Sequence, residues 1–138
     1  MNKEFVTYNQ ALALKELGFN ESCIAIYSNA NPKTGLYNSK KYKLKLIKQS
    51  SQIDKGVKSP LYQQAFRWFR DKHDLSGEVY TINMGAIDYT FGIRDLYSED
   101  LIHDNFEACA AGYVGTFLNY EEAYSACLDK LIEISKNK

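Results

Sequence analysis

A row of lysines on an alternating stretch of the chain carries the first chemistry that the sequence offers. Lys41, Lys43 and Lys45 alternate with apolar residues, so a strand here would place their ammonium groups on one face. Ammonium groups in a row can contact phosphate oxygens, which predicts a site for a nucleotide or a nucleic acid. The favoured alternative is a solvated strand, because lysines also discourage edge-to-edge pairing and the 17 basic residues of the chain are balanced by 17 acidic ones.

Two arginines flank a pair of aromatic residues in the middle of the chain. Arg67 and Arg70 could bind phosphate while Trp68 and Phe69 stack on a base. At helical spacing the same aromatic residues also fit a buried core, with the arginine stems covering apolar surface at its margin. This second interpretation is favoured, and both arginines remain candidate binding residues.

A second alternating stretch holds the remaining candidate binding residues, Asp88 and Arg94. With Thr90 between them, and with His73 from an earlier segment, they form a loose group of acid, base and hydroxyl. The chain contains no P-loop, no GxGxxG, no HExxH and no nucleophile elbow. The sequence therefore predicts no catalytic residue and no cofactor.

Metal ligands and thiols are present, but their spacing does not match a known site. Five side chains of one acidic loop could offer oxygen or imidazole ligands to a divalent cation: Glu99, Asp100, His103, Asp104 and Glu107. The loop lacks the alternating oxygens of a calcium site, so we expect it to be solvated and to hold no metal. The three cysteines lie far apart without a CxxC pair, and we expect them to be reduced and mostly buried.

The first half of the chain predicts a helix followed by a hairpin. Thr7 and Gln10 form a capping box at the start of a helix, and Gly18 favours its end near Leu17. We expect two strands at residues 23–27 and 41–46, which should pair with each other. A polar surface loop is expected at residues 49–58.

The second half predicts a helix, another hairpin and a final helix. Ser59 suits the N-cap and Pro60 the first turn of a helix that reaches His73. In the hairpin, the apolar side chains should meet the helices, and the polar set that includes Thr90 should meet water or a ligand. Asn119 caps the last helix. The hairpin strands are expected at residues 79–84 and 86–94. An acidic loop is expected at residues 95–105 and a further strand at residues 113–117.

The predicted fold class is α+β, because hairpins and helices are segregated rather than alternating as in a parallel sheet. The expected order is α-β-β-α-β-β-(β)-α, with two antiparallel hairpins packed against three helices. The hairpins could share one sheet, to which the bracketed strand would add. At 138 residues the chain has the size of one domain, so a single domain over residues 1–138 is expected.

Composition bounds the environment of the protein. A hydrophobic fraction of 45% with 25% charged residues is typical of a folded globular chain. The first residues contain no apolar signal segment, and no apolar run approaches the roughly 20 residues that span a bilayer. We therefore expect a cytoplasmic protein without a membrane partner.

Three segments together resemble a known family. They are TYNQALALKELGF, SPLYQQAFRWFRDKH and NYEEAYSACLDKLIEI, at residues 7–19, 59–73 and 119–134. The set is similar to a family of short uncharacterised proteins from bacteriophages and prophages of gut bacteria. Its members pair a Leu-Lys-Glu-Leu-Gly-Phe helix end with a Pro-Leu-Tyr-Gln-Gln-Ala-Phe-x-Trp-Phe-Arg helix and a Tyr-Glu-Glu-Ala terminal helix. The resemblance implies a phage origin and brings no assigned activity.

Three functional hypotheses follow. The leading one is a non-catalytic, phage-derived binding protein that contacts a host or phage protein, or itself, through a sheet face bearing some of its eleven tyrosines. The alternative is a nucleotide or nucleic-acid binder, for example one that sequesters a nucleotide signal of host defence. A metal-assisted hydrolase centred on the acidic loop is the third and least favoured.

Overall fold

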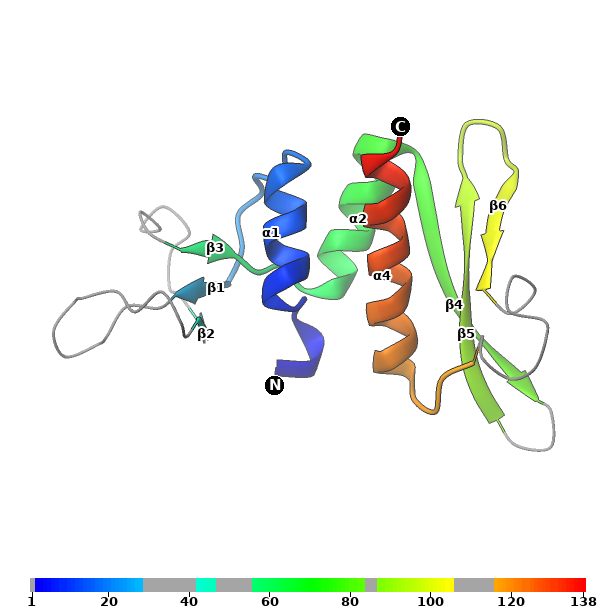
Figure 1. Cartoon of the computed structure of the whole chain (residues 1–138), viewed down its shortest axis with the longest axis horizontal. Coiled ribbons are helices and arrows are strands. Elements are labelled where there is room, and N and C mark those ends of the chain that lie inside the picture. Colours follow the sequence, from blue (N-terminus) through cyan, green and yellow to red (C-terminus); the bar gives the residue numbers. More distant parts are fainter. Residues whose placement is uncertain (1, 29–41, 47–55, 84–86, 106–115) are drawn as a thin grey trace, which may run out of the picture. The chain divides into compact units, whose positions relative to one another are not determined.

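The computed structural model describes residues 2–28, 42–46, 56–83, 87–105 and 116–138 (Figure 1). Within them it contains three α-helices and two three-stranded antiparallel sheets, so the predicted α+β class and the order of helices and strands are confirmed. The chain divides into an N-terminal unit, Met1–Leu61, and a C-terminal unit, Tyr62–Lys138. That these form one domain stays a prediction. None of the described helices combines the length and apolar character needed to cross a membrane.

The first helix of the N-terminal unit forms as the sequence predicts. After a short 3-10 helix, η1 (Asn2–Glu4), the helix α1 (Tyr8–Glu16) begins at the capping box, in which Thr7 and Gln10 each accept a hydrogen bond from the other's backbone N–H. Leu17 caps the end of the helix, and Gly18 follows with a φ of +101°, in the left-handed region that favours glycine.

The sheet of the N-terminal unit has the order β2-β1-β3. β1 (Ala25–Ser28) pairs with β2 (Lys43–Leu46), which confirms the predicted hairpin. β3 (Val57–Lys58) pairs with the other edge of β1, where the sequence predicted only a loop. Val57 is buried opposite Tyr27, so one apolar residue holds a strand too short to show any alternation.

The segment after β3 corrects the predicted start of the second helix. Ser59 is fully buried and donates a hydrogen bond through Oγ to the carbonyl of Val6, which also accepts one from the hydroxyl of Tyr27. The carbonyl of Pro60 accepts a hydrogen bond from the backbone N–H of Val6. Ser59 is therefore no N-cap, because these residues are tied to the N-terminal segment before the helix α2 (Tyr62–His73) begins.

α2 ends at His73 as predicted, and Asp74, with a φ of +54°, turns the chain directly into a sheet. The strands β4 (Leu75–Asn83), β5 (Ile87–Asp95) and β6 (Leu101–Asp104) pair in that order. β4 begins earlier than expected, and β6 occupies part of the predicted acidic loop. The strand predicted at residues 113–117 lies largely outside the described residues, and Phe117 pairs with Tyr89 in an isolated bridge.

The last helix, α4 (Tyr120–Lys136), packs with α2 on one face of this sheet (Figure 1). Asn119 caps it by accepting a hydrogen bond from the N–H of Glu122, as predicted. The core between helices and sheet is apolar and fully or almost fully buried; it includes Phe66, Phe69, Leu75, Ile93, Cys127, Leu128 and Leu131. A Cβ added to Gly77 would lie 2.7 Å from the sulfur of Cys127, so glycine allows α4 to approach β4 closely.

Candidate functional site

Three lysines of the N-terminal sheet share one face. In the strand register, Ile26 of β1 lies opposite Lys45 of β2 on one side and Lys58 of β3 on the other. Residues opposite each other point to the same face, and the two lysine backbones are about 10 Å apart across two strand spacings. Lys43, two residues before Lys45, joins them. We call Lys43, Lys45 and Lys58 the lysine face; Lys41 lies outside the described residues.

Lys58 is the member of the lysine face that sequence reasoning missed. The sequence pattern predicts a loop at this position, and only the pairing with Ile26 places Lys58 beside the others. Its ammonium group donates hydrogen bonds to the backbone and side-chain oxygens of Asn20, at 3.4 and 3.2 Å. These partners are neutral amides. Lys43 is exposed and Lys45 is half-buried.

Two stacked tyrosines lie at the edge of the same sheet. The rings of Tyr8 and Tyr42 are 4.3 Å apart with an interplanar angle of 19°, and Tyr27 meets Tyr8 edge to face at 5.6 Å. Burial and the neighbouring Tyr42 phenol raise the pKa of Tyr8, which keeps its phenol neutral at physiological pH. Since successive strand residues point to opposite faces, Tyr42 lies on the other side of the sheet from Lys43.

The division of the chain also separates its charges. Residues 1–61 contain ten lysines, no arginine and four acidic residues, so their net charge is +6. Residues 62–138 contain seven basic and thirteen acidic residues, so their net charge is −6. The neutral total therefore conceals a basic and an acidic unit, and it does not argue against a phosphate-binding surface on the N-terminal unit.

The arginine pair does not form a stacking site. Trp68 and Phe69 are 4% and 0% exposed, which confirms their interpretation as core. Arg67 is exposed and Arg70 half-buried, so both lie at the margin of α2 as the amphipathic pattern predicts. Without an accessible ring beside them, these arginines offer charge alone.

The group of Asp88, Thr90 and Arg94 is not assembled either. Asp88 and Arg94 are six positions apart along β5, which corresponds to about 20 Å. The guanidinium of Arg94 donates to the carbonyl of Glu99 at 3.0 Å. His73 has its ring against Trp68, with ring centres 4.9 Å apart.

The prediction that Thr90 meets water or a ligand is wrong, because Thr90 is fully buried. Tyr80 lies opposite Thr90 and donates from its hydroxyl to Oδ1 of Asp104, two strands away, at 2.7 Å. Its ring crosses β5 beside Gly92, where a Cβ would be 3.9 Å from Tyr80 Cε1. The central strand is thus covered on its outer face by a side chain of the neighbouring strand.

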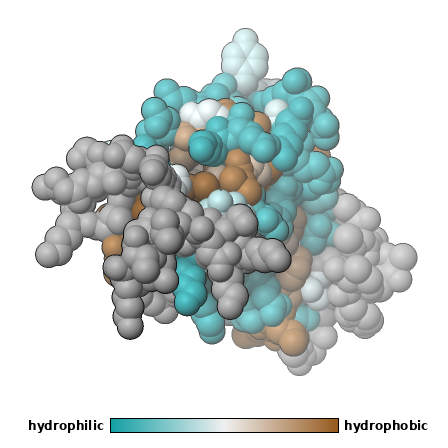
Figure 2. Space-filling model, turned by 60° about the vertical axis from the view of Figure 1, so that its left-hand side comes forward, coloured by the Kyte–Doolittle hydropathy of each residue, from teal (hydrophilic) through white to brown (hydrophobic). Residues whose placement is uncertain are grey.

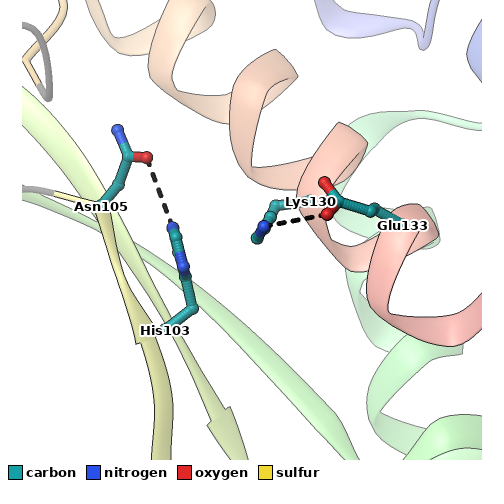
Figure 3. A network of polar contacts seen from close by, with 4 residues as sticks. All are labelled: His103, Asn105, Lys130 and Glu133. Carbon is teal, nitrogen blue, oxygen red and sulfur yellow. Dashed lines mark hydrogen bonds and ion pairs between the residues drawn. The ribbon is translucent and has the colours of Figure 1, made fainter. Parts of the chain in front are cut away.

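The potential metal ligands of the acidic segment are dispersed. His103 and Asp104 are neighbours in β6 and point to opposite faces of the sheet. His103 packs against Phe91, and its Nε2 lies 3.3 Å from Oδ1 of Asn105 (Figure 3). In the same view, Lys130 forms an ion pair with Glu133 of its own helix, at 3.1 Å. In the part of the chain that the structure describes, no three His, Cys, Asp or Glu side chains are placed to hold a metal ion; Glu107 lies outside it.

The two described cysteines are buried free thiols. Burial raises the pKa of Cys23 to about 11, against which the nearby Lys58 ammonium acts only in part. Burial also raises the pKa of Cys127, to which Glu78 adds. Both thiols are protonated at neutral pH, so neither is prepared as a nucleophile. Cys109 lies outside the described residues.

No protein-family model, curated protein or solved structure matches the chain. The resemblance to phage proteins therefore stays a prediction, and the function is argued from the geometry of the lysine face.

Proposed function

We propose that this protein is a non-catalytic binding protein of the cytoplasm that binds nucleic acid through its lysine face. The register that places Lys45 and Lys58 on either side of Ile26 carries the proposal. Two ammonium groups on the two edge strands of one small sheet can contact phosphates of a single nucleic-acid strand, and Lys43 adds a third ammonium group on β2. Such contacts bind the backbone without reading its sequence.

The charge of the sequence from residue 33 to residue 58 supports the same function. Residues 33–58 contain eight lysines and a single acidic residue, Asp54. A local excess of this size attracts polyanions at long range and releases counterions from them on binding. We therefore expect affinity that depends strongly on salt and little on base sequence.

The test is fluorescence anisotropy with a labelled single-stranded oligonucleotide over a range of salt concentrations. The variant Lys45→Gln/Lys58→Gln removes two ammonium groups from the face, and Lys3→Gln/Lys15→Gln removes two exposed ones elsewhere in the same unit. Each phosphate contact on a single strand contributes about 0.7 to the slope of log K against log salt, so the first variant should lower the slope by about 1.4. The control should keep the wild-type slope.

Three results would overturn the proposal. One is the absence of binding at low salt, and a second is an equal loss of slope in both variants, which would mean that only net charge matters. Thermal stabilisation by a free nucleotide without oligonucleotide binding would also contradict it and would favour a small-nucleotide site instead. Thermal melts of both variants control for folding, because Lys58 also bonds to Asn20.

Binding of a host or phage protein is the second candidate function, and exposed apolar residues of the C-terminal unit favour it. Tyr97 is 91% exposed at the β5–β6 turn, and Leu101 and Ile102 at the start of β6 are each more than 40% exposed. Figure 2 shows the chain from another side, where apolar residues reach the surface in separate areas between hydrophilic ones. Aromatic and aliphatic residues of this kind are frequent in protein interfaces.

A photo-crosslinking residue at position 97, introduced into the protein in its producing cells, tests this candidate. It should capture one discrete protein, whereas the same residue at the exposed position 129 of α4 should capture none. Identical products from both positions would mean that the contact is non-specific.

A further inference from the structure

Edge strands differ in how they are protected from pairing with other chains. In the described sheets, β2 bears Lys43 and Lys45, and β3 has two residues, one of them Lys58. β6 has four residues and an irregular register opposite Ile93 and Arg94. Lysines, short length and bulges are the usual means by which sheet edges avoid intermolecular pairing.

β4 has none of these features. It is nine residues long, contains no lysine or proline, and pairs with β5 in unbroken register from Leu75 to Asn83. Glu78 is its only charged residue. No other described strand pairs with its outer edge, because the sheet order is β4-β5-β6.

The groups on that outer edge follow from the hydrogen-bond pattern. The carbonyl of Asp74 accepts a hydrogen bond from the N–H of Leu96, so even-numbered residues of β4 direct their backbone groups to β5. Odd-numbered residues then point their N–H and C=O groups outward; these are Leu75, Gly77, Val79, Thr81 and Asn83.

We propose that β4 pairs antiparallel with β4 of a second copy of the chain, which joins two three-stranded sheets into one of six strands. A two-fold axis at Val79 places Gly77 opposite Thr81 of the other copy and Glu78 opposite Tyr80. No like charges then face each other, and every outward group of one strand meets its counterpart in the other. A second copy fits better than an unrelated peptide, because the edge is complementary to itself in this register.

Electrostatics gives the dimer a signature of its own. Residues 62–138 carry a net charge of −6, so two copies repel one another and salt, which screens this repulsion, strengthens the pairing. Binding of nucleic acid to the lysine face has the opposite dependence, so the two proposals succeed or fail separately.

Amide hydrogen exchange measured by NMR at two protein concentrations tests the pairing residue by residue. At high concentration the amides of Gly77, Val79 and Thr81 should be as protected as those of Glu78 and Tyr80. On dilution to monomer, as followed by sedimentation, the odd-numbered amides should lose protection and the even-numbered ones should keep it. A chain that stays monomeric at all concentrations overturns the proposal, as does protection of the odd-numbered amides in the monomer.

Two variants complete the test. Val79→Pro removes an outward N–H without breaking a bond to β5, and Thr81→Lys adds a charge to the edge while keeping its N–H. Each should weaken the dimer about tenfold or more, because the change occurs twice at a two-fold interface. Ser98→Lys, an equal charge change at the exposed β5–β6 turn, should leave dimerisation as in the wild type. If Thr81→Lys keeps its fold by circular dichroism and still dimerises as strongly as the wild type, pairing through this edge is refuted.

Discussion

The two compact units differ in charge and in the way they bury their sheets. Among the described residues, the N-terminal unit has strands of four residues or fewer beside one α-helix of nine residues. The described part of the C-terminal unit has two strands of nine residues packed against two longer helices. Its fully buried side chains include Phe66, Phe69, Leu128 and Leu131. Those of the N-terminal unit include Val6 and Leu14, beside polar ties such as the bonds of Tyr27 and Ser59 to the Val6 carbonyl.

The two units therefore differ in which of them supplies the apolar core and which supplies the basic surface. The unit with the larger apolar core carries the acidic charge, and the unit with short strands carries ten of the seventeen basic residues. A small sheet can present lysines on one face because few of its side chains are needed for burial on that face.

The largest expected effect comes from truncating the core of each unit in turn. Leu128→Ala and Leu14→Ala each remove a fully buried leucine, from α4 and α1, and should cost about 2–5 kcal/mol of unfolding free energy. Trp68 is the only tryptophan and lies in the C-terminal unit, so its fluorescence reports unfolding there. The chain is predicted to be one domain. In each variant the fluorescence transition and the circular dichroism transition should therefore shift together, to the same denaturant concentration.

An N-terminal unit that unfolds independently would contradict this expectation. Leu14→Ala would then shift the circular dichroism curve in two steps and leave the Trp68 transition where it is in the wild type. That outcome would make the two units separate domains.

A smaller effect is expected from filling the close contact under β4. In Gly77→Ala the new methyl group would lie 2.7 Å from Cys127 Sγ and 3.0 Å from a methyl carbon of Leu131, so the variant should lose about 1–3 kcal/mol. Urea unfolding measures the loss. Adding Cys127→Ala removes the closest clash and should recover part of it, so the double variant should be more stable than the sum of the single changes. Strict additivity would mean that the helix, rather than the cysteine, moves.

Local signals predicted the hairpins and the helix ends other than the start of α2, whereas features that depend on distant contacts were missed. The bonds of Thr7 with Gln10 and of Asn119 with Glu122 span three residues, so the sequence contains the whole interaction. Thr90 is buried opposite Tyr80, ten residues away, and β3 depends on its pairing with β1.

The candidate site divides in the same way. The alternation of Lys43 and Lys45 was visible in the sequence, but Lys58 joins them only through the strand register. The separation of charge could not be recognised before the boundary between residues 61 and 62 was known.

The smallest expected effect is a pH dependence that belongs to the C-terminal unit. Burial, together with the nearby Lys138 ammonium, lowers the pKa of His73 from its ordinary 6.5, and Asp74 opposes this shift only in part. The unfolded chain therefore binds more protons than the folded one, so stability is fully present above pH 6.5 and declines as the pH falls below it. His73→Phe keeps the ring contacts with Trp68 and Phe69 but cannot be protonated. Its melting temperature should fall less than that of the wild type between pH 7.5 and 5.5. The free energy of unfolding that corresponds to this difference should be smaller than the loss expected for Gly77→Ala. Lys138→Ala removes the second cause of the pKa shift, so its fall in melting temperature should lie between those of the wild type and His73→Phe. If all three proteins show parallel pH profiles, the acid sensitivity belongs to the carboxylates of this unit instead.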